Sequence, residues 1–319
     1  MDKPMSTDSD YLAAQTGAVL INRNSEGRVR VTGRDRLDLL HRMSTNDTNS
    51  LAAGEARQTV LTTALARIVD APWVLNRGET ALMVTGPGRA TAVRRWLAGY
   101  IFFRDEVKLE EASAELSQLA IFGKEAAAIA EALLPGSGAL NPNRFSEQEG
   151  LLAWRGRPLA GDGFHLIAPA AQFDSLWARA VAAGAVAASE ETYQLLRLAA
   201  GVPEAGHELT ESYLPLETDL WDAVSFTKGC YIGQEIIARM ESRGKLARRL
   251  SGLRLEAPAA LGAEVRAGGA VVGEVTSAGV LPGLGPAALS VIRTGACEPG
   301  TDVTVGEVTG RVVALPFVN

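Results

Sequence analysis

Apolar and polar residues follow one another along this chain in two different patterns, and the pattern changes near residue 246. Before that point, strand-like runs lead into single segments whose apolar residues recur every three or four positions, as in helices. After it, short valine-rich runs alternate with glycine and proline turns and show no helical period. The pattern predicts an α+β region followed by a small, purely β module. Helices are expected within residues 34–47, 88–99, 124–136, 171–184 and 189–201.

Local signals fix some of the element ends. Residues 19–33 are expected to form two strands around a turn at residues 24–27. Ser189 is suited to cap the N-terminus of the fifth helix, and Gly201 is suited to end it. This helix is expected to bring Arg197 close to a loop rich in acidic residues.

The repetition of strand groups that lead into helices indicates a divided chain. Two related sheet-plus-helix subdomains, interleaved in sequence, are expected within residues 1–245, and a C-terminal β-barrel within residues 246–319. A length of 319 residues exceeds one typical core, which agrees with two or three parts.

Composition narrows the class of protein. Apolar residues make up 47% of the chain and charged residues 21%, as in ordinary folded proteins. No apolar run approaches the roughly 18 residues of a membrane helix, so no membrane partner is expected. The N-terminal residues do not resemble an export signal, which predicts a cytoplasmic location.

Charge and metal-ligating residues exclude two further classes. The net charge of -6 argues against direct nucleic-acid binding. The basic cluster Arg243, Lys245, Arg248 and Arg249 is interpreted as a solvated helix end. The two cysteines lie far apart and the three histidines occur singly, so neither a disulfide framework nor a metal site is expected.

The segment SFTKGCYIGQEII, residues 225–237, carries the most distinctive chemistry. A helix is expected to begin around Gly233, so the Cys230 thiol lies just before its N-terminus. That N-terminus and Lys228 would both favour the thiolate. A small apolar residue packed in the interior is an equally good interpretation of Cys230 from position and charge alone.

The neighbours of the cysteine allow two interpretations as well. Gly229 and Gly233 permit a close approach that a β-carbon would obstruct, so some group is expected near this backbone. Gln234 and Glu235 are either functional residues or ordinary first-turn residues, because a carboxylate suits the N-terminus of a helix.

The octapeptide KGCYIGQE resembles the signature of the YgfZ family, folate-binding proteins related to the glycine-cleavage T protein, an aminomethyltransferase. Residues 31–70, 195–206 and 213–220 are similar to the same families in the same order. The resemblance implies a three-part ring, in which two α+β subdomains and a barrel surround a central channel that receives tetrahydrofolate. It also implies folate-binding roles for Arg197, Gly229, Tyr231, Gly233, Gln234, Glu235 and Asp162.

The resemblance also distinguishes between the two families. T proteins carry an aspartate that faces the folate nitrogen where one-carbon transfer occurs, and Thr91 or Ala92 stands at the corresponding position here. Gly161 occupies the place of a glutamate that grips the pterin in T proteins, and Asp162 follows it. The loss of the transfer aspartate together with the gain of Cys230 favours the YgfZ family.

The function implied is a tetrahydrofolate-binding protein that supports the assembly or repair of iron-sulfur clusters, and through them tRNA modification. Cys230 and Lys228 are its expected acting residues, and iron-sulfur proteins or assembly factors are its transient partners. One alternative is an aminomethyltransferase that uses another carboxylate, such as Asp105 or Asp162. The other is a thiol-based enzyme or redox sensor that binds no folate.

Overall fold

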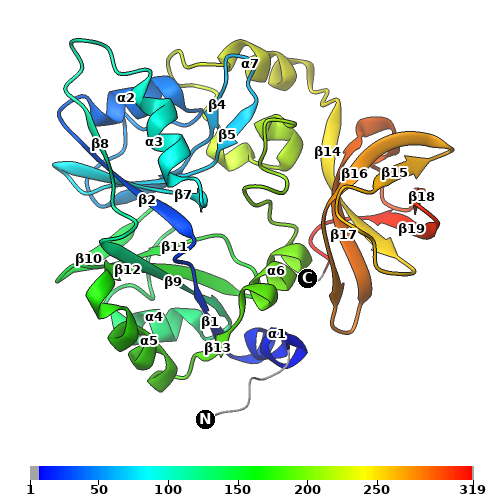
Figure 1. Ribbon diagram of the computed structural model, residues 1–319, viewed down its shortest axis with the longest axis horizontal. Helices are drawn as coiled ribbons and strands as arrows, with labels where there is room; N and C mark the ends of the chain where they lie inside the picture. The colour runs from blue at the N-terminus through cyan, green and yellow to red at the C-terminus, as the bar shows by residue number, and fades with distance from the viewer. Residues whose placement is uncertain (1–6, 318–319) are drawn as a thin grey trace.

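The computed structural model describes residues 7–317 of the chain. Figure 1 shows two sheets stacked against each other at the left and a barrel at the right. Helices α6 and α7 lie on the side of the sheets that is nearer to the barrel (Figure 1). The α+β region and the closed C-terminal barrel that the sequence predicts are both present.

The first sheet carries two helices on its outer side. Its strand order is β3-β6-β7-β2-β8, and α2 (Arg36–Met43) and α3 (Ala90–Ala98) pack on it through a core that includes Leu40, Val93 and Leu97. A separate pair, β4 (Leu61–Thr62) and β5 (Ile68–Asp70), lies beside it. The strands of the first sheet are β2 (Glu26–Thr32), β3 (Glu55–Gln58), β6 (Trp73–Asn76), β7 (Thr80–Pro87) and β8 (Lys108–Glu111).

The second sheet has six strands in the order β10-β11-β12-β9-β1-β13. The helices α4 (Ala126–Leu133) and α5 (Phe173–Ala182) cover one of its faces. The helices α1 (Thr7–Thr16) and α6 (Glu190–Ala200) pack beside β1, which lies next to the edge strand β13. Its strands are β1 (Ala18–Asn22), β9 (Leu116–Gly123), β10 (Phe145–Gln148), β11 (Leu151–Arg155), β12 (Asp162–Pro169) and β13 (Val186–Ala188).

The two strands expected around the turn at residues 24–27 do form, but they do not pair with each other. β1 pairs with β9 and β13 in the second sheet, whereas β2 pairs with β7 and β8 in the first. The chain therefore passes from one sheet to the other at residues 23–25, and the strands of the two sheets are interleaved along the chain. Leu82 and Val84 of one sheet and Leu152 and Trp154 of the other join the sheets through a shared apolar core.

The sequence signals at α6 and α7 are confirmed. The Ser189 hydroxyl accepts the backbone N–H of Thr192 at 3.2 Å, and Gly201 ends α6 with a φ of 70°. Helix α7 (Gln234–Arg243) begins after Gly233. Between these helices run two short 3₁₀ turns, Pro215–Thr218 and Trp221–Ala223.

The C-terminal module is a barrel closed by six strands in the order β14-β17-β16-β15-β18-β19. Closure removes the exposed strand edges that a six-stranded open sheet would leave. The strands are β14 (Arg248–Leu255), β15 (Glu264–Ala267), β16 (Ala270–Leu281), β17 (Gly285–Arg293), β18 (Asp302–Val305) and β19 (Val308–Val313), with a 3₁₀ turn at Thr294–Ala296. No helix among residues 7–317 is long and apolar enough to cross a membrane.

Candidate functional site

A cleft with a cavity volume of about 110 Å³ lies between the two sheets and is bordered by the segment that follows α6. This volume is below the roughly 300–1,000 Å³ that is typical of small-molecule sites, so the cleft encloses part of a ligand and not the whole of it. Strands β5, β6 and β7 line one side, β9, β11 and β12 line the other, and Val202–Ala205 lie along the border. The cleft therefore exists because the chain crosses between the sheets and returns along α6.

Aromatic rings form much of the cleft lining. The rings of Trp154 and His165 stack with their centroids 4.8 Å apart, and Phe122 meets His165 edge to face at 5.8 Å. Trp73 and Tyr193 add two further rings. Such a lining suits a planar heterocycle, because aromatic faces bury its surface without requiring hydrogen bonds.

His165 is held in its neutral form by this lining. Burial lowers the pKa of His165 to about 4, since the apolar surroundings disfavour the imidazolium ion. Its Nδ1 lies 3.5 Å from the side-chain amide nitrogen of Gln118. At neutral pH His165 is therefore an uncharged packing residue and no cation.

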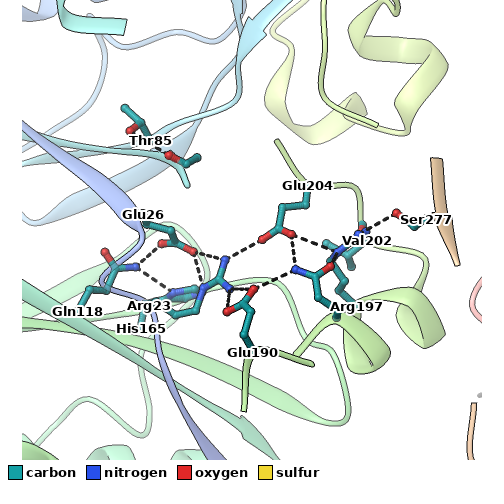
Figure 2. A network of polar contacts seen from close by, with 12 residues as sticks. Arg23, Glu26, Thr85, Gln118, His165, Glu190, Arg197, Val202, Glu204 and Ser277 are labelled. Atoms are coloured by element: carbon teal, nitrogen blue, oxygen red, sulfur yellow. Dashed lines mark hydrogen bonds and ion pairs between the residues drawn. The ribbon is translucent and has the colours of Figure 1, made fainter. Parts of the chain in front are cut away.

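A network of buried charges borders the cleft, and Figure 2 shows Arg23 at its centre. The guanidinium group of Arg23 donates to Glu26 at 2.9 Å and to Glu204 at 2.7 Å, and it pairs with Glu190 at 2.9 Å. It also lies over the ring of Tyr193, 3.7 Å from the centroid. Burial acts to raise the pKa of Glu204, but the charges of Arg23 and Arg197 lower it. The pKa of Glu204 is therefore below its usual value.

Arg197 extends the network to the barrel. Its guanidinium group lies 3.3 Å from a carboxylate oxygen of Glu204 and 3.2 Å from one of Glu208, and it donates to the hydroxyl of Ser277 on β16 at 2.7 Å. Gln194 and the carbonyl of Val202 accept its remaining hydrogen bonds. Arg197 is not among the residues that line the cleft, which it reaches only through Glu204.

Asp70 is a buried carboxyl group at the end of β5 that lines the cleft. It is 1% exposed, and it accepts the backbone N–H of Gly86 at 3.1 Å. Burial raises the pKa of Asp70 to about 6, against the opposing effect of the N–H groups of Gly86 and Ala71. A carboxyl group with such a pKa in a cleft marks a candidate functional residue.

The KGCYIGQE segment is fastened to the end of α2. The ammonium group of Lys228 donates to the backbone oxygens of His41 at 2.6 Å and of Ser44 and Asn46 at 2.8 Å each. Burial lowers the pKa of Lys228 to about 8. These three bonds occupy all the donors of an ammonium group, so Lys228 acts on the last turn of α2 and not on the thiol.

Cys230 is exposed in the loop before α7, so the interpretation as a packed interior residue does not apply to it. At Gly229 an added β-carbon would come within 3.7 Å of Nε2 of His41 alone. At Gly233, where φ is 83°, it would lie 2.8 Å from the carbonyl oxygen of Thr63. The close approach expected at Gly233 is therefore made by the protein itself.

The remaining residues expected to bind folate lie outside the cleft lining. Tyr231 is buried, with the Lys228 ammonium 4.9 Å from its ring centroid. Gln234 is half-buried in the first turn of α7, and Glu235 is exposed and paired with Arg239 at 2.7 Å. Asp162 is paired with Arg155. The structure thus gathers the KGCYIGQE residues in one place but does not bring them to the cleft.

The positions compared with T proteins also lie away from the cleft. Thr91 and Ala92 are on the exposed side of α3, and the Thr91 hydroxyl donates to Glu111. Asp105 accepts from Arg42 at 2.7 Å in the loop after α3, and the Phe102 N–H and Arg42 lower the pKa of Asp105. None of these side chains faces the cleft.

Sequence reasoning missed the residues that do line the cleft. Asp70 stands in the run RIVDAPWVL, where a lone carboxylate between apolar residues signals a buried polar group. Arg157, Trp73 and Trp154 also line the cleft and follow no motif. Burial lowers the pKa of Arg157, while Asp219 and Asp222 act in the opposite direction. These residues meet only through the stacking of the two sheets.

Comparison with known proteins identifies the fold and the family. The sequence profile of the GCVT N-terminal domain matches residues 4–228. The crystal structure of the glycine cleavage system aminomethyltransferase T from Bartonella henselae superposes with a TM-score of 0.89 at 24% identity, over all of this chain and 91% of that one.

Several relatives match over nearly the whole chain. The protein named "Putative transferase At1g60990, chloroplastic" from Arabidopsis thaliana is 30% identical over 96% of this chain and 72% of its own length. An aminomethyltransferase of Rubrobacter xylanophilus is 32% identical over 97% of this chain and 85% of its own length.

The burial of neutral His165 predicts a loss of stability in mild acid. Below about pH 6.5 the unfolded chain binds a proton at this histidine, whereas the folded chain does not until about pH 4. We expect wild-type stability to fall by about 2 kcal/mol between pH 6.5 and pH 5 through this group, and not in His165→Gln. Urea unfolding of both proteins at the two pH values measures this. An equal pH dependence in the two proteins would contradict it.

The network around Arg197 predicts a large cost for removing its charge. Arg197→Met leaves Glu204 and Glu208 short of a partner, and breaking a buried ion pair in this way costs about 3–5 kcal/mol. Thermal or urea unfolding measures the change. The control is Arg311→Met, which removes an exposed pair with Asp302 and is expected to change little. Equal effects of the two substitutions would show that the network is not structural.

Proposed function

Because the chain belongs to the GCVT family, we propose that it binds tetrahydrofolate in the cleft between the two sheets. We further propose that it acts in the cytoplasm as a YgfZ-type protein, which uses Cys230 to support the assembly or repair of iron-sulfur clusters and, through them, tRNA modification. The observation that carries the folate proposal is the aromatic cleft with its unpaired buried carboxyl group.

The residues of the cleft fit a reduced pterin. The half-buried rings of Trp73 and His165 offer surface to a ligand ring, and Asp70 offers a carboxylate to its N–H groups.

The sheets and the barrel take part in different ways in this proposal. We propose that the three parts form a ring around the channel that receives folate. Arg197 contributes by holding Glu204 at the border of the cleft and by linking that border to Ser277 of the barrel. Gly229, Tyr231, Gly233, Gln234 and Glu235 belong to the segment that presents Cys230, and Asp162 lies at the start of β12.

Cys230 supports the iron-sulfur part of the proposal because its thiol is exposed on a segment that Lys228 fastens to α2. One thiolate supplies only one of the four protein ligands that a cluster normally takes. Contact with a cluster or with a client thiol is therefore shared with a partner protein and transient. Among residues 7–317 no group of three or more His, Cys, Asp or Glu is arranged to hold a metal ion.

The second candidate is an aminomethyltransferase, which the names of several relatives favour. In such an enzyme a carboxylate at the folate nitrogen provides acid-base assistance typically worth about 10²- to 10⁴-fold. The positions where that aspartate was expected, Thr91 and Ala92, are exposed on α3. This placement favours the YgfZ-type function.

The folate proposal predicts saturable binding that depends on the aromatic lining. Tetrahydrofolate is expected to bind the wild-type protein in calorimetric titration, and Trp73→Ala to bind it about tenfold or more weakly, because stacking on one ring contributes about 1–3 kcal/mol. The control Trp177→Ala alters a tryptophan on α5, outside the cleft. Absence of wild-type binding, or unchanged affinity in Trp73→Ala, would count against this site.

The thiol proposal predicts that binding and biological activity separate in Cys230→Ala. This variant is expected to fold and to bind tetrahydrofolate as the wild type does, because the side chain is exposed and lies outside the cleft. It is expected to fail to restore iron-sulfur enzyme activity in a deletion strain, whereas Cys297→Ala restores it. Full rescue by Cys230→Ala would refute the role of the thiol. Sustained formation of methylene-tetrahydrofolate from an aminomethylated lipoyl carrier would instead establish the second candidate.

A further inference from the structure

Asp70 is the carboxyl group of the cleft that has no ion-pair partner in the described part of the chain. Glu26 and Glu204, which also line the cleft, both accept from Arg23, and Glu204 is also paired with Arg197. The nearby guanidinium group of Arg89 donates to the carbonyl of Val69 at 2.8 Å. Asp70 is left with backbone N–H groups as its hydrogen-bond donors.

The backbone around Asp70 keeps this carboxyl group in place. Gly86 on β7 donates to it, and an added β-carbon at Gly86 would lie 3.0 Å from a carboxylate oxygen of Asp70 and 2.3 Å from Cβ of Ala205. A glycine at this position therefore lets β7, Asp70 and the Val202–Ala205 border approach one another. The position of Asp70 in the cleft follows from main-chain packing and does not depend on a flexible side chain.

A buried carboxylate that has no cation beside it is stabilised by hydrogen-bond donors. Its ionised form is disfavoured by burial, which is why the pKa of Asp70 is raised to about 6. N–H donors of a ligand stabilise the ionised form and lower that pKa again. Adjacent N–H donors on a planar ring, such as the amide and amino edge of a pterin, are suited to a carboxylate.

We propose that Asp70 is the residue that pairs with the N–H groups of the bound pterin, that it does so as a carboxylate, and that ligand binding is therefore linked to loss of a proton from Asp70. The inference rests on the proposed folate function and adds the residue and the pH dependence. Affinity is then full above about pH 6 and falls as Asp70 becomes protonated below it.

The charged groups that face Asp70 do not provide this titration. Arg89 at the N-cap of α3 and Arg23 after β1 are arginines, whose guanidinium groups do not lose their charge in proteins. Glu26 is paired with Arg23, and Arg23 and Arg197 hold the pKa of Glu204 low. In the same cleft the pKa of His165 is lowered to about 4, and burial raises that of Tyr193.

The test is calorimetric titration with tetrahydrofolate at pH 7.5 and pH 5, on the wild type, Asp70→Asn and Asp174→Asn. We expect wild-type affinity to be about tenfold weaker at pH 5, because about one Asp70 in eleven is then ionised. Asp70→Asn is expected to bind about tenfold or more weakly than the wild type at pH 7.5 and to approach it at pH 5. Asp174, exposed on α5, is the matched control and is expected to keep the wild-type profile.

A second measurement needs no variant. Titrations of the wild type at pH 6 in two buffers of different ionisation enthalpy count the protons exchanged, and we expect about half a proton to be released per folate bound. The same titrations of Asp70→Asn give the protons that the ligand itself exchanges, and this number is subtracted from the wild-type value. A cooperative unfolding transition of Asp70→Asn shows that this variant is folded. Wild-type affinity equal at both pH values, or no proton release, overturns the inference alone. Failure of the wild type to bind at either pH overturns the folate function as well.

Discussion

The molecule depends on a chain of buried charges in which each arginine is shared between carboxylates. Arg23 lies where the polypeptide leaves the second sheet for the first, and it joins Glu26 to Glu204. Glu204 is shared with Arg197, which continues to Glu208 and to Ser277 of the barrel. Buried charges are tolerated only when each is compensated, so this network fixes how the two sheets, α6 and the barrel meet. The cleft has its shape because these contacts are complete.

The cleft and the thiol segment are separate in the structure, but one small element touches both. Strand β5 ends at Asp70 in the cleft and pairs with β4, whose Thr62 donates its hydroxyl hydrogen to the carbonyl of Ile232 in the thiol segment. Gly233 packs against the turn that connects these two strands. A ligand at Asp70 therefore contacts the same strand pair that supports the loop carrying Cys230. In the proposed function, folate binding and presentation of the thiol would therefore share a scaffold without sharing residues.

The parts of the structure that depend on local chemistry could be predicted from the sequence. The cap at Ser189, the end of α6 at Gly201 and the start of α7 at Gly233 follow from hydrogen bonding and backbone freedom within a few residues. The barrel follows from its short valine-rich runs. The cleft could not be predicted, because Asp70, Trp154 and His165 meet only when the sheets stack. Arg197 was expected to bind folate, but it is not among the residues that line the cleft, and its buried partners show that it holds the border instead.

The crossing of the chain between sheets sets an order on biosynthesis. β1 is complete by residue 22, but its neighbours are β9, which ends at residue 123, and β13, which begins at residue 186. During synthesis the first sheet can form while β1 is still unpaired. The second sheet is complete only after more than half of the chain has left the ribosome. Strand pairing between residues so far apart in sequence is slow, and an unpaired apolar strand can meanwhile form non-native contacts. The cleft wall formed by β9, β11 and β12 is therefore completed only after β1 has remained unpaired during synthesis of the first sheet, a stage at which exposed apolar strands favour misfolding.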